Sequence, residues 1–155
     1  QTRVWAEGGF YGRIFFNIKG REPRGAVAES EVPALQHELK SALEAARDEH
    51  QSLLGNRVLL PQSVYEQRKG VCPDLLLYPG DLDLRASARV GGDVVFTQND
   101  TGPDRANHSR HGVCVLYGGM ERGWREDLSI YDVLPTALHH LDLPIPADLG
   151  GKVLL

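Results

Sequence analysis

Methionine, cysteine and long apolar runs are all scarce in this sequence of 155 residues. The only methionine is Met120 and the first residue is Gln1, so we expect either a processed chain or a piece of a longer one. No apolar run approaches the roughly 20 residues that span a bilayer, which excludes a membrane-spanning helix and predicts a soluble protein. The sequence identifies no compartment, although the cytoplasm is slightly favoured.

The two cysteines, Cys72 and Cys114, form no C-x-x-C pair. Their spacing therefore excludes a zinc knuckle and a thioredoxin-like redox motif. A single disulfide stays open, but two buried thiols are the favoured interpretation. The 17 basic and 21 acidic residues give a net charge of −4, so no basic field marks a nucleic-acid-binding protein.

The residues that are present suit one folded unit spanning residues 1–155, because 41% are apolar and 25% are charged. Helical spacing of apolar residues predicts a main helix over 30–50, and helix-start residues favour a second one over 132–141. A shorter helix is expected over 63–69. Apolar runs between glycines and prolines predict strands at 13–18, 57–60, 74–78, 82–86, 94–97 and 112–117. Strands interspersed with helices predict a layered α/β fold, a sheet with packed helices, in which several strands could pair antiparallel.

Residues suited to bind a metal gather in the second half of the chain. Residues 74–104 contain six aspartates and only two arginines, and Asp104 is followed by His108 and His111 in a polar loop. These side chains carry metal-ligand atoms at a spacing that a loop allows. The alternative is that the aspartates occupy turns and that the loop is solvated. No nucleophile elbow, phosphate-binding loop or H-E-x-x-H motif is present.

Three blocks of the sequence follow a known pattern. Residues 16–27 read F-N-I-K-G-R-E-P-R-G-A-V, and residues 108–115 read H-S-R-H-G-V-C-V. The third block combines D-V-L-P-T-A-L at 132–138 with L-P-I-P at 143–146 and G-K-V-L at 151–154. In this order they resemble the C-terminal part of a type I phosphodiesterase/nucleotide pyrophosphatase of the alkaline phosphatase superfamily. The resemblance extends over nearly the whole chain.

This resemblance implies the C-terminal portion of an alkaline phosphatase-like fold and a phosphate ester or nucleotide as substrate. It also implies two divalent metal ions, usually zinc, and a Thr or Ser nucleophile. The family's last metal ligand is a histidine four residues before a glycine, which matches His108 and Gly112. Arg21 lies in a loop that the family keeps near its site, so it is the candidate for binding the substrate phosphate. An ion pair of Arg21 with Glu22 or another carboxylate is the alternative.

The family's nucleophile and its other metal ligands lie upstream of the first block, and this chain does not contain them. Because one histidine cannot hold two zinc ions, we expect the 155 residues alone to be inactive. The resemblance thus predicts the C-terminal part of a metal-dependent phosphodiesterase or phosphohydrolase. The alternatives are a stand-alone, non-catalytic binding or interaction domain derived from this fold, or a part of a phosphomutase or sulfatase relative.

Overall fold

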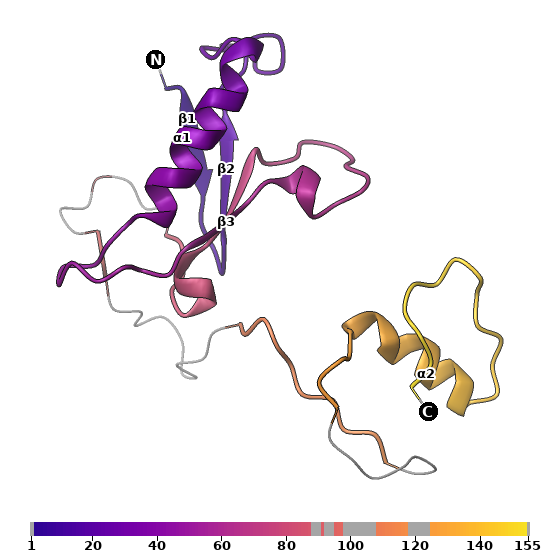
Figure 1. Cartoon of the computed structure of the whole chain (residues 1–155). Helices are drawn as coiled ribbons and strands as arrows, with labels where there is room; N and C mark the ends of the chain where they lie inside the picture. Colours follow the sequence, from indigo (N-terminus) through magenta and orange to yellow (C-terminus); the bar gives the residue numbers. More distant parts are fainter. Residues whose placement is uncertain (1, 88–90, 92–94, 98–107, 118–124, 155) are drawn as a thin grey trace. The chain divides into compact units, whose positions relative to one another are not determined.

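The computed structural model describes residues 2–87, 91, 95–97, 108–117 and 125–154. The chain divides into two compact units, residues 1–112 and residues 113–155. Figure 1 shows the first unit as a sheet with helix α1 (Val32–Glu44) across it, and the second as helix α2 (Val133–His140) with the C-terminal segment. That the whole chain forms one folded unit, as its length predicts, remains a prediction.

The first unit contains one four-stranded antiparallel sheet with the order β1-β2-β4-β3. Its strands are β1 (Val4–Glu7), β2 (Gly12–Phe16), β3 (Arg57–Leu59) and β4 (Leu75–Tyr78). The strands expected at 13–18, 57–60 and 74–78 are therefore confirmed, with small changes at their ends. Together with the two α-helices of the described residues, this sheet makes a mixed α/β structure.

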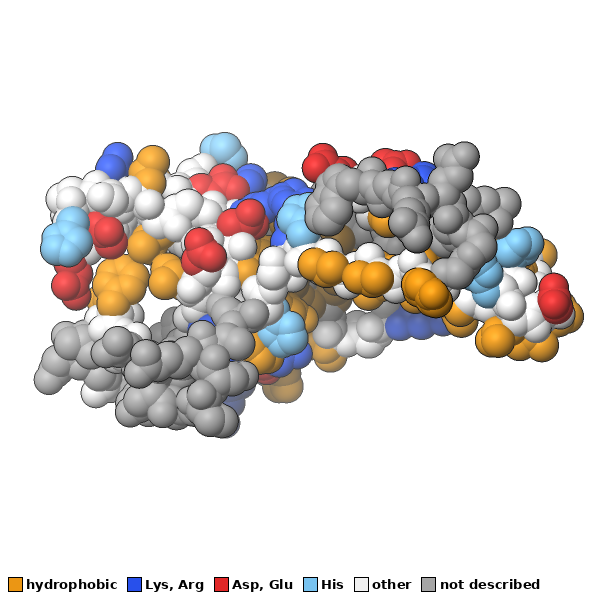
Figure 2. Space-filling model, turned by 90° about the horizontal axis from the view of Figure 1, so that it is seen from below, with side chains coloured by type: hydrophobic (Ala, Val, Ile, Leu, Met, Phe, Trp, Pro, Cys, Tyr) orange, Lys and Arg blue, Asp and Glu red, His pale blue; other side chains and the backbone are white. Residues whose placement is uncertain are grey.

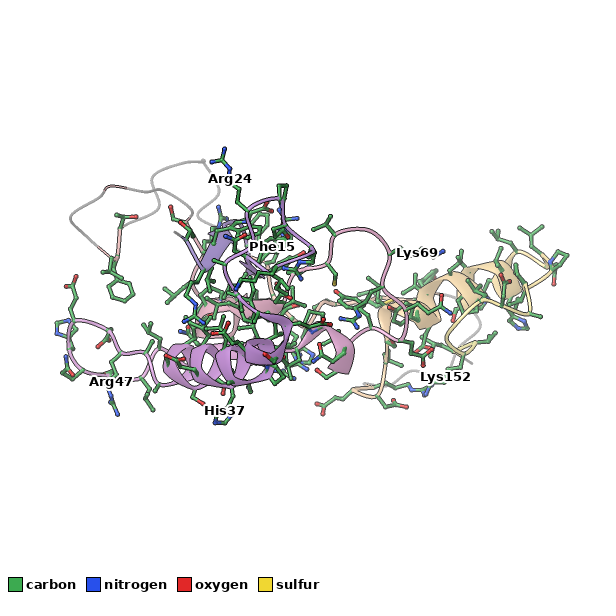
Figure 3. The ribbon with its side chains drawn as sticks, turned by 90° about the horizontal axis from the view of Figure 1, so that it is seen from above. Phe15, Arg24, His37, Arg47, Lys69 and Lys152 are labelled. Atoms are coloured by element: carbon green, nitrogen blue, oxygen red, sulfur yellow. The ribbon has the colours of Figure 1, made fainter. Side chains whose placement is uncertain are left out.

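Helix α1 (Val32–Glu44) packs against one face of this sheet. The core that they share consists of Ile14, Phe16, Val27, Leu35, Val58 and Leu75. The helix was expected over 30–50 and ends earlier, because the Asp48 carboxylate accepts the backbone N–H groups of His50 and Ser52 and holds a turn there. His37 lies on the side of α1 that faces away from the sheet (Figure 3).

Two short elements differ from the expectation. The helix predicted over 63–69 is wrong, since only the single 3-10 turn η2 (Pro61–Ser63) forms in this region. Val64 and Tyr65 are about half exposed and pack into no core, and a short helix without packing is unstable. The strand predicted at 82–86 is also wrong. The 3-10 turn η3 (Pro79–Leu82) is followed by a single bridge between Ala86 and Gly9.

The buried strand predicted at 112–117 is likewise wrong. The structure gives these residues no strand, and Val113 is 86% and Tyr117 103% exposed. An apolar segment becomes a strand only where a neighbouring strand pairs with it, and no described residue does so here. The strand expected at 94–97 begins outside the described residues.

The second unit contains the 3-10 turn η4 (Ile130–Asp132) and helix α2 (Val133–His140). This confirms the helix expected over 132–141. Few of its side chains are buried, and large apolar ones such as Ile130, Leu134 and Leu141 are more than half exposed. Hydrophobic side chains are accordingly visible on its surface in Figure 2. Such exposed apolar area is typical of a surface that packs against something else.

Both cysteines are free thiols, and neither is fully buried. Cys72 is half-buried and Cys114 is exposed. The interpretation as two buried thiols is therefore wrong, because Cys114 belongs to the segment that forms no strand. Within the described ranges, no helix combines the length and the apolar character needed to cross a membrane.

Candidate functional site

The loop that follows β2 contains the first block of the resemblance and is held by its own backbone. The Asn17 side chain donates to the carbonyl oxygens of Thr2 and Arg24, at 2.7 and 3.0 Å. The Asn17 carbonyl oxygen in turn accepts from the backbone N–H groups of residues 26 and 27. A Cβ atom on Gly25 would lie only 2.4 Å from Lys19 Cα, so this close approach requires glycine. The loop is thereby fixed beside the end of β2.

Arg21 of this loop forms a two-pronged ion pair with Asp74, the residue before β4. Its Nη1 and Nη2 atoms donate to Asp74 Oδ1 and Oδ2 at 2.8 and 2.7 Å. Nη2 also donates to the carbonyl oxygen of Phe16 at 2.5 Å, and Nε donates to Glu22 Oε1 at 3.1 Å. The hydrogen bond to Asp74 is the main reason why the pKa of Arg21 is raised above its ordinary value.

Asp74 also accepts the backbone N–H of Phe16, at 2.6 Å from Oδ2. The pairing of β2 with β4 ends before Phe16. At Phe16 the side chains of Asp74 and Arg21 take the place of β4, because Asp74 accepts the N–H group and Arg21 donates to the C=O group. We call Arg21, Asp74 and the Phe16 backbone the Asp74 cluster. It completes the hydrogen bonding of β2 and attaches the loop to the sheet.

The Asp74 cluster limits what Arg21 can bind. A guanidinium has five N–H donors, and the bonds to Asp74, Phe16 and Glu22 use four of them. A phosphate would meet one remaining N–H in this arrangement, instead of the two that give arginine its preference for phosphate. The structure thus contains the ion pairs that were the alternative for Arg21, with Glu22 and with a second carboxylate. Phosphate binding by Arg21 remains a prediction.

An open cleft of about 550 Å³ lies beside this cluster. It is lined by Arg21, Glu22, Gln36, Gln62, Glu66, Arg68, Gly70, Val71, Cys72, Pro73 and Asp74. Two arginines face three carboxylates in this lining, so the cleft does not concentrate positive charge. Its chemistry suits a polar, hydrogen-bonding ligand better than a phosphate group.

His108, the metal ligand that the resemblance implies, is exposed in the first unit. Its ring meets the Phe10 ring edge-on, with 3.7 Å between the centroids. The Arg85 guanidinium lies 4.8 Å from the centre of the same Phe10 ring. Sequence reasoning had not singled out Phe10, since nothing in its spacing connects it with a histidine 98 positions later.

The part of the chain that the structure describes does not make a metal centre by itself. No three of its His, Cys, Asp and Glu side chains come together as metal ligands. Asp104 lies outside the described residues, as do Asp93 and Asp100. Asp81 and Asp83 are exposed at the turn η3, as expected if they favour turns. A single imidazole does not fit a two-zinc centre, so no step of a metal reaction is assigned to these residues.

The third block of the resemblance forms a second carboxylate-centred cluster, in the second unit. Asp132 is 3% exposed and accepts the backbone N–H groups of Ser129 and Lys152, at 2.8 and 2.9 Å. The hydrogen bond from Lys152 is the main reason why the pKa of Asp132 is lowered, and the bond from Ser129 is the second. The buried Thr136 hydroxyl donates to the Asp132 carbonyl oxygen and accepts the N–H of Leu154. This Asp132 cluster therefore joins the start of α2 to the C-terminal segment.

Comparison of the chain with family models, with curated proteins and with solved structures gives no match in any of the three. The resemblance to phosphodiesterases accordingly rests on the three sequence blocks, and it bears on function only as a basis for a proposal.

Proposed function

We propose that this chain is the C-terminal part of a metal-dependent phosphodiesterase or phosphohydrolase, with His108 as one ligand of its metal centre. The observation that carries the proposal is the order and spacing of the three sequence blocks. The remaining ligands and the nucleophile would come from residues that this chain does not contain. The substrate class is a phosphate ester or a nucleotide.

The way in which the blocks fold supports this proposal. The first block forms the Asp74 cluster and the third forms the Asp132 cluster, so both are structural joints. The middle block, which begins at His108, is exposed throughout. An exposed imidazole is what a histidine needs in order to bind a metal held by another part of the protein.

The exposed apolar residues of the second unit also support it. Val113, Val115 and Tyr117 alternate along a segment with strand-forming side chains, and all are more than 80% exposed. Leaving them in water forfeits roughly 1.5–3 kcal/mol for each large side chain that burial would gain. Such a segment fits a protein in which further residues form a sheet beside it.

The experiment uses the full gene product that contains this chain, purified without chelators. We expect His108→Ala to lower its zinc content, measured by mass spectrometry of the metal, and its hydrolysis of bis(p-nitrophenyl) phosphate. His111→Ala is the matched control, because His111 is an exposed histidine of the same loop and has no ligand role in the family. Unchanged zinc content and activity after His108→Ala would contradict the assignment.

The 155-residue chain alone provides the second arm. We expect no hydrolysis of the same diester with zinc or manganese added, because no described group of side chains forms a metal centre. Clear turnover by the purified chain would refute the proposal that the catalytic residues lie elsewhere. A full gene product that binds no zinc and hydrolyses no diester would instead favour a non-catalytic binding domain.

A further inference from the structure

The sheet has two edges, β3 and β1, and among the described residues side chains close only the first. At β3, the Val58 carbonyl oxygen accepts from Lys40 Nζ at 2.9 Å, and the Val58 N–H donates to Glu44 Oε1 at 3.2 Å. Lys40 and Glu44 also form an ion pair with each other, four residues apart on α1. The outward backbone groups of β3 are therefore occupied, and another strand cannot pair with them unless α1 releases them.

The other edge, β1, presents its backbone outward. The Asn17 N–H donates to the Arg3 carbonyl oxygen at 2.8 Å. Because hydrogen bonding alternates along an antiparallel ladder, the backbone N–H and C=O groups of Trp5 and Glu7 also point toward β2. The N–H and C=O groups of Val4 and Ala6 then point away from the sheet. Among the described residues no strand lies on that side of β1. An edge of this kind is a template for strand addition.

The side chains of β1, together with Arg3 directly before it, are complementary to those of a second copy. Arg3 and Glu7 carry opposite charges at equal distances before and after Trp5. In an antiparallel pair with Val4 opposite Ala6 of the other copy, Arg3 faces Glu7 and Trp5 faces Trp5. We propose that a second copy of this chain pairs with β1 in this register and joins the two four-stranded sheets. This inference is independent of the proposed phosphodiesterase function.

Charge selects this register over its neighbours. Pairing Val4 with Val4 of the second copy would place Arg3 opposite Trp5, and pairing Ala6 with Ala6 would place Glu7 opposite Trp5. Only the register with Val4 opposite Ala6 brings the two charges together. Edge strands of one charge sign repel a second copy, whereas this strand attracts one.

The same charges already have partners within one copy. Arg3 pairs with Glu31 at 3.0 Å and Glu7 pairs with Arg13 at 2.8 Å, and all four side chains are about half exposed. Across the dimer, the charges would therefore alternate in sign from Glu31 and Arg3 of one copy to Glu7 and Arg13 of the other. Trp5, which stacks on Phe15 with 5.5 Å between the ring centroids, adds an aromatic pair at the centre.

The experiment measures the dimerisation of the 155-residue chain by sedimentation velocity over a range of concentrations. We expect a concentration-dependent dimer that is weakened roughly tenfold or more by Arg3→Glu, and equally by Glu7→Arg, because each variant places like charges opposite each other. An equimolar mixture of the two variants should dimerise again. In the mixed dimer each introduced charge faces the opposite introduced charge, and each retained Arg3 faces a retained Glu7.

Two further variants make the result specific. Ala6→Pro removes an outward N–H without removing a bond to β2, and it should abolish the dimer while circular dichroism shows a folded chain. Glu38→Arg, which makes the same charge change at an exposed position of α1, should leave the dimer unchanged. A native chain that stays monomeric at every concentration overturns the proposal. So does a dimer that Ala6→Pro does not weaken, or a mixture that does not dimerise again.

Discussion

Asp74 and Asp132 do the same structural work in the two units, but with different partners. Asp74 neutralises its charge with the Arg21 guanidinium and binds one backbone N–H. Asp132 forms no ion pair with a basic side chain among the described residues, and it accepts the backbone N–H groups of Ser129 and Lys152. The difference shows that a carboxylate can join distant segments either through a counter-ion or through backbone donors. The first arrangement depends on one other side chain, and the second on backbone geometry.

Of the variants that separate the two clusters, Gly151→Ala is expected to have the largest effect on stability, and it acts on the Asp132 cluster alone. Gly151 has a φ of +92°, and an added Cβ would lie 2.2 Å from the Tyr131 carbonyl oxygen. We expect a loss of roughly 3 kcal/mol or more in local stability, from strain and the steric clash together. Amide hydrogen exchange at Lys152 and Leu154 measures it. Gly112→Ala is the control, because its added Cβ meets nothing within 4 Å.

If Gly151→Ala leaves exchange at these two amides unchanged, the Asp132 cluster does not hold the C-terminal segment. Accelerated exchange at the Phe16 amide, in the other unit, would show that the two clusters are not independent.

A smaller effect is expected from Arg21→Lys, which acts on the Asp74 cluster. A lysine ammonium cannot bind both Asp74 oxygens and the Phe16 carbonyl oxygen in the planar arrangement of arginine. We expect a loss of roughly 2 kcal/mol, measured as faster amide exchange at Phe16. Arg13→Lys is the matched control, since Arg13 belongs to an exposed ion pair with Glu7. Equal effects of the two variants would show that the two-pronged pair has no special role.

The smallest effect is a dependence on pH that comes from the Asp132 cluster. The fold lowers the pKa of Asp132, so its carboxylate stabilises the folded state above the ordinary value of about 3.9. This contribution is lost as the pH falls through the lowered pKa. Thermal unfolding followed by circular dichroism should therefore show Asp132→Asn less stable at pH 7 and closer to the native chain near pH 3. A difference that is constant over this range would contradict the linkage.

Asp127 provides the control for this experiment. Its pKa is lowered to about 2, mainly by hydrogen bonds from Arg125 and then from Lys152. Its side chain is exposed, however, and exposed ion pairs contribute little to stability. Asp127→Asn should therefore leave the unfolding temperature unchanged at neutral pH.

Local pattern explains which parts of the fold could be predicted from the sequence. Strands β2 and β4 were predicted because their apolar runs are bounded by glycines and prolines, and α1 because its apolar residues recur at helical spacing. Strand β1 was not predicted, since it lies in a stretch rich in glycine and aromatic residues. The segment 112–117 has the same apolar pattern as β4, but none of the described strands lies beside it, and pattern alone does not reveal a partner.

The candidate site shows the same limit. An ion pair of Arg21 with Glu22 could be proposed because the residues are adjacent, but Asp74 is 53 positions away and its approach depends on the register of β2 with β4. The contact of His108 with Phe10 likewise depends on tertiary structure. Chemistry that is local in sequence could be predicted, whereas pairing across the sheet could not.

The Asp74 cluster has a consequence for how this unit can change. Because the side chains of Arg21 and Asp74 finish the ladder of β2, the sheet does not rely on the connection between β3 and β4 at that end. Within the exposed residues 64–71 of this connection, Glu66, Arg68, Gly70 and Val71 line the cleft. Insertions and deletions there would reshape the cleft while the sheet stays intact. This connection is therefore the place where relatives of the chain could acquire different ligands, and where a new binding loop could be grafted.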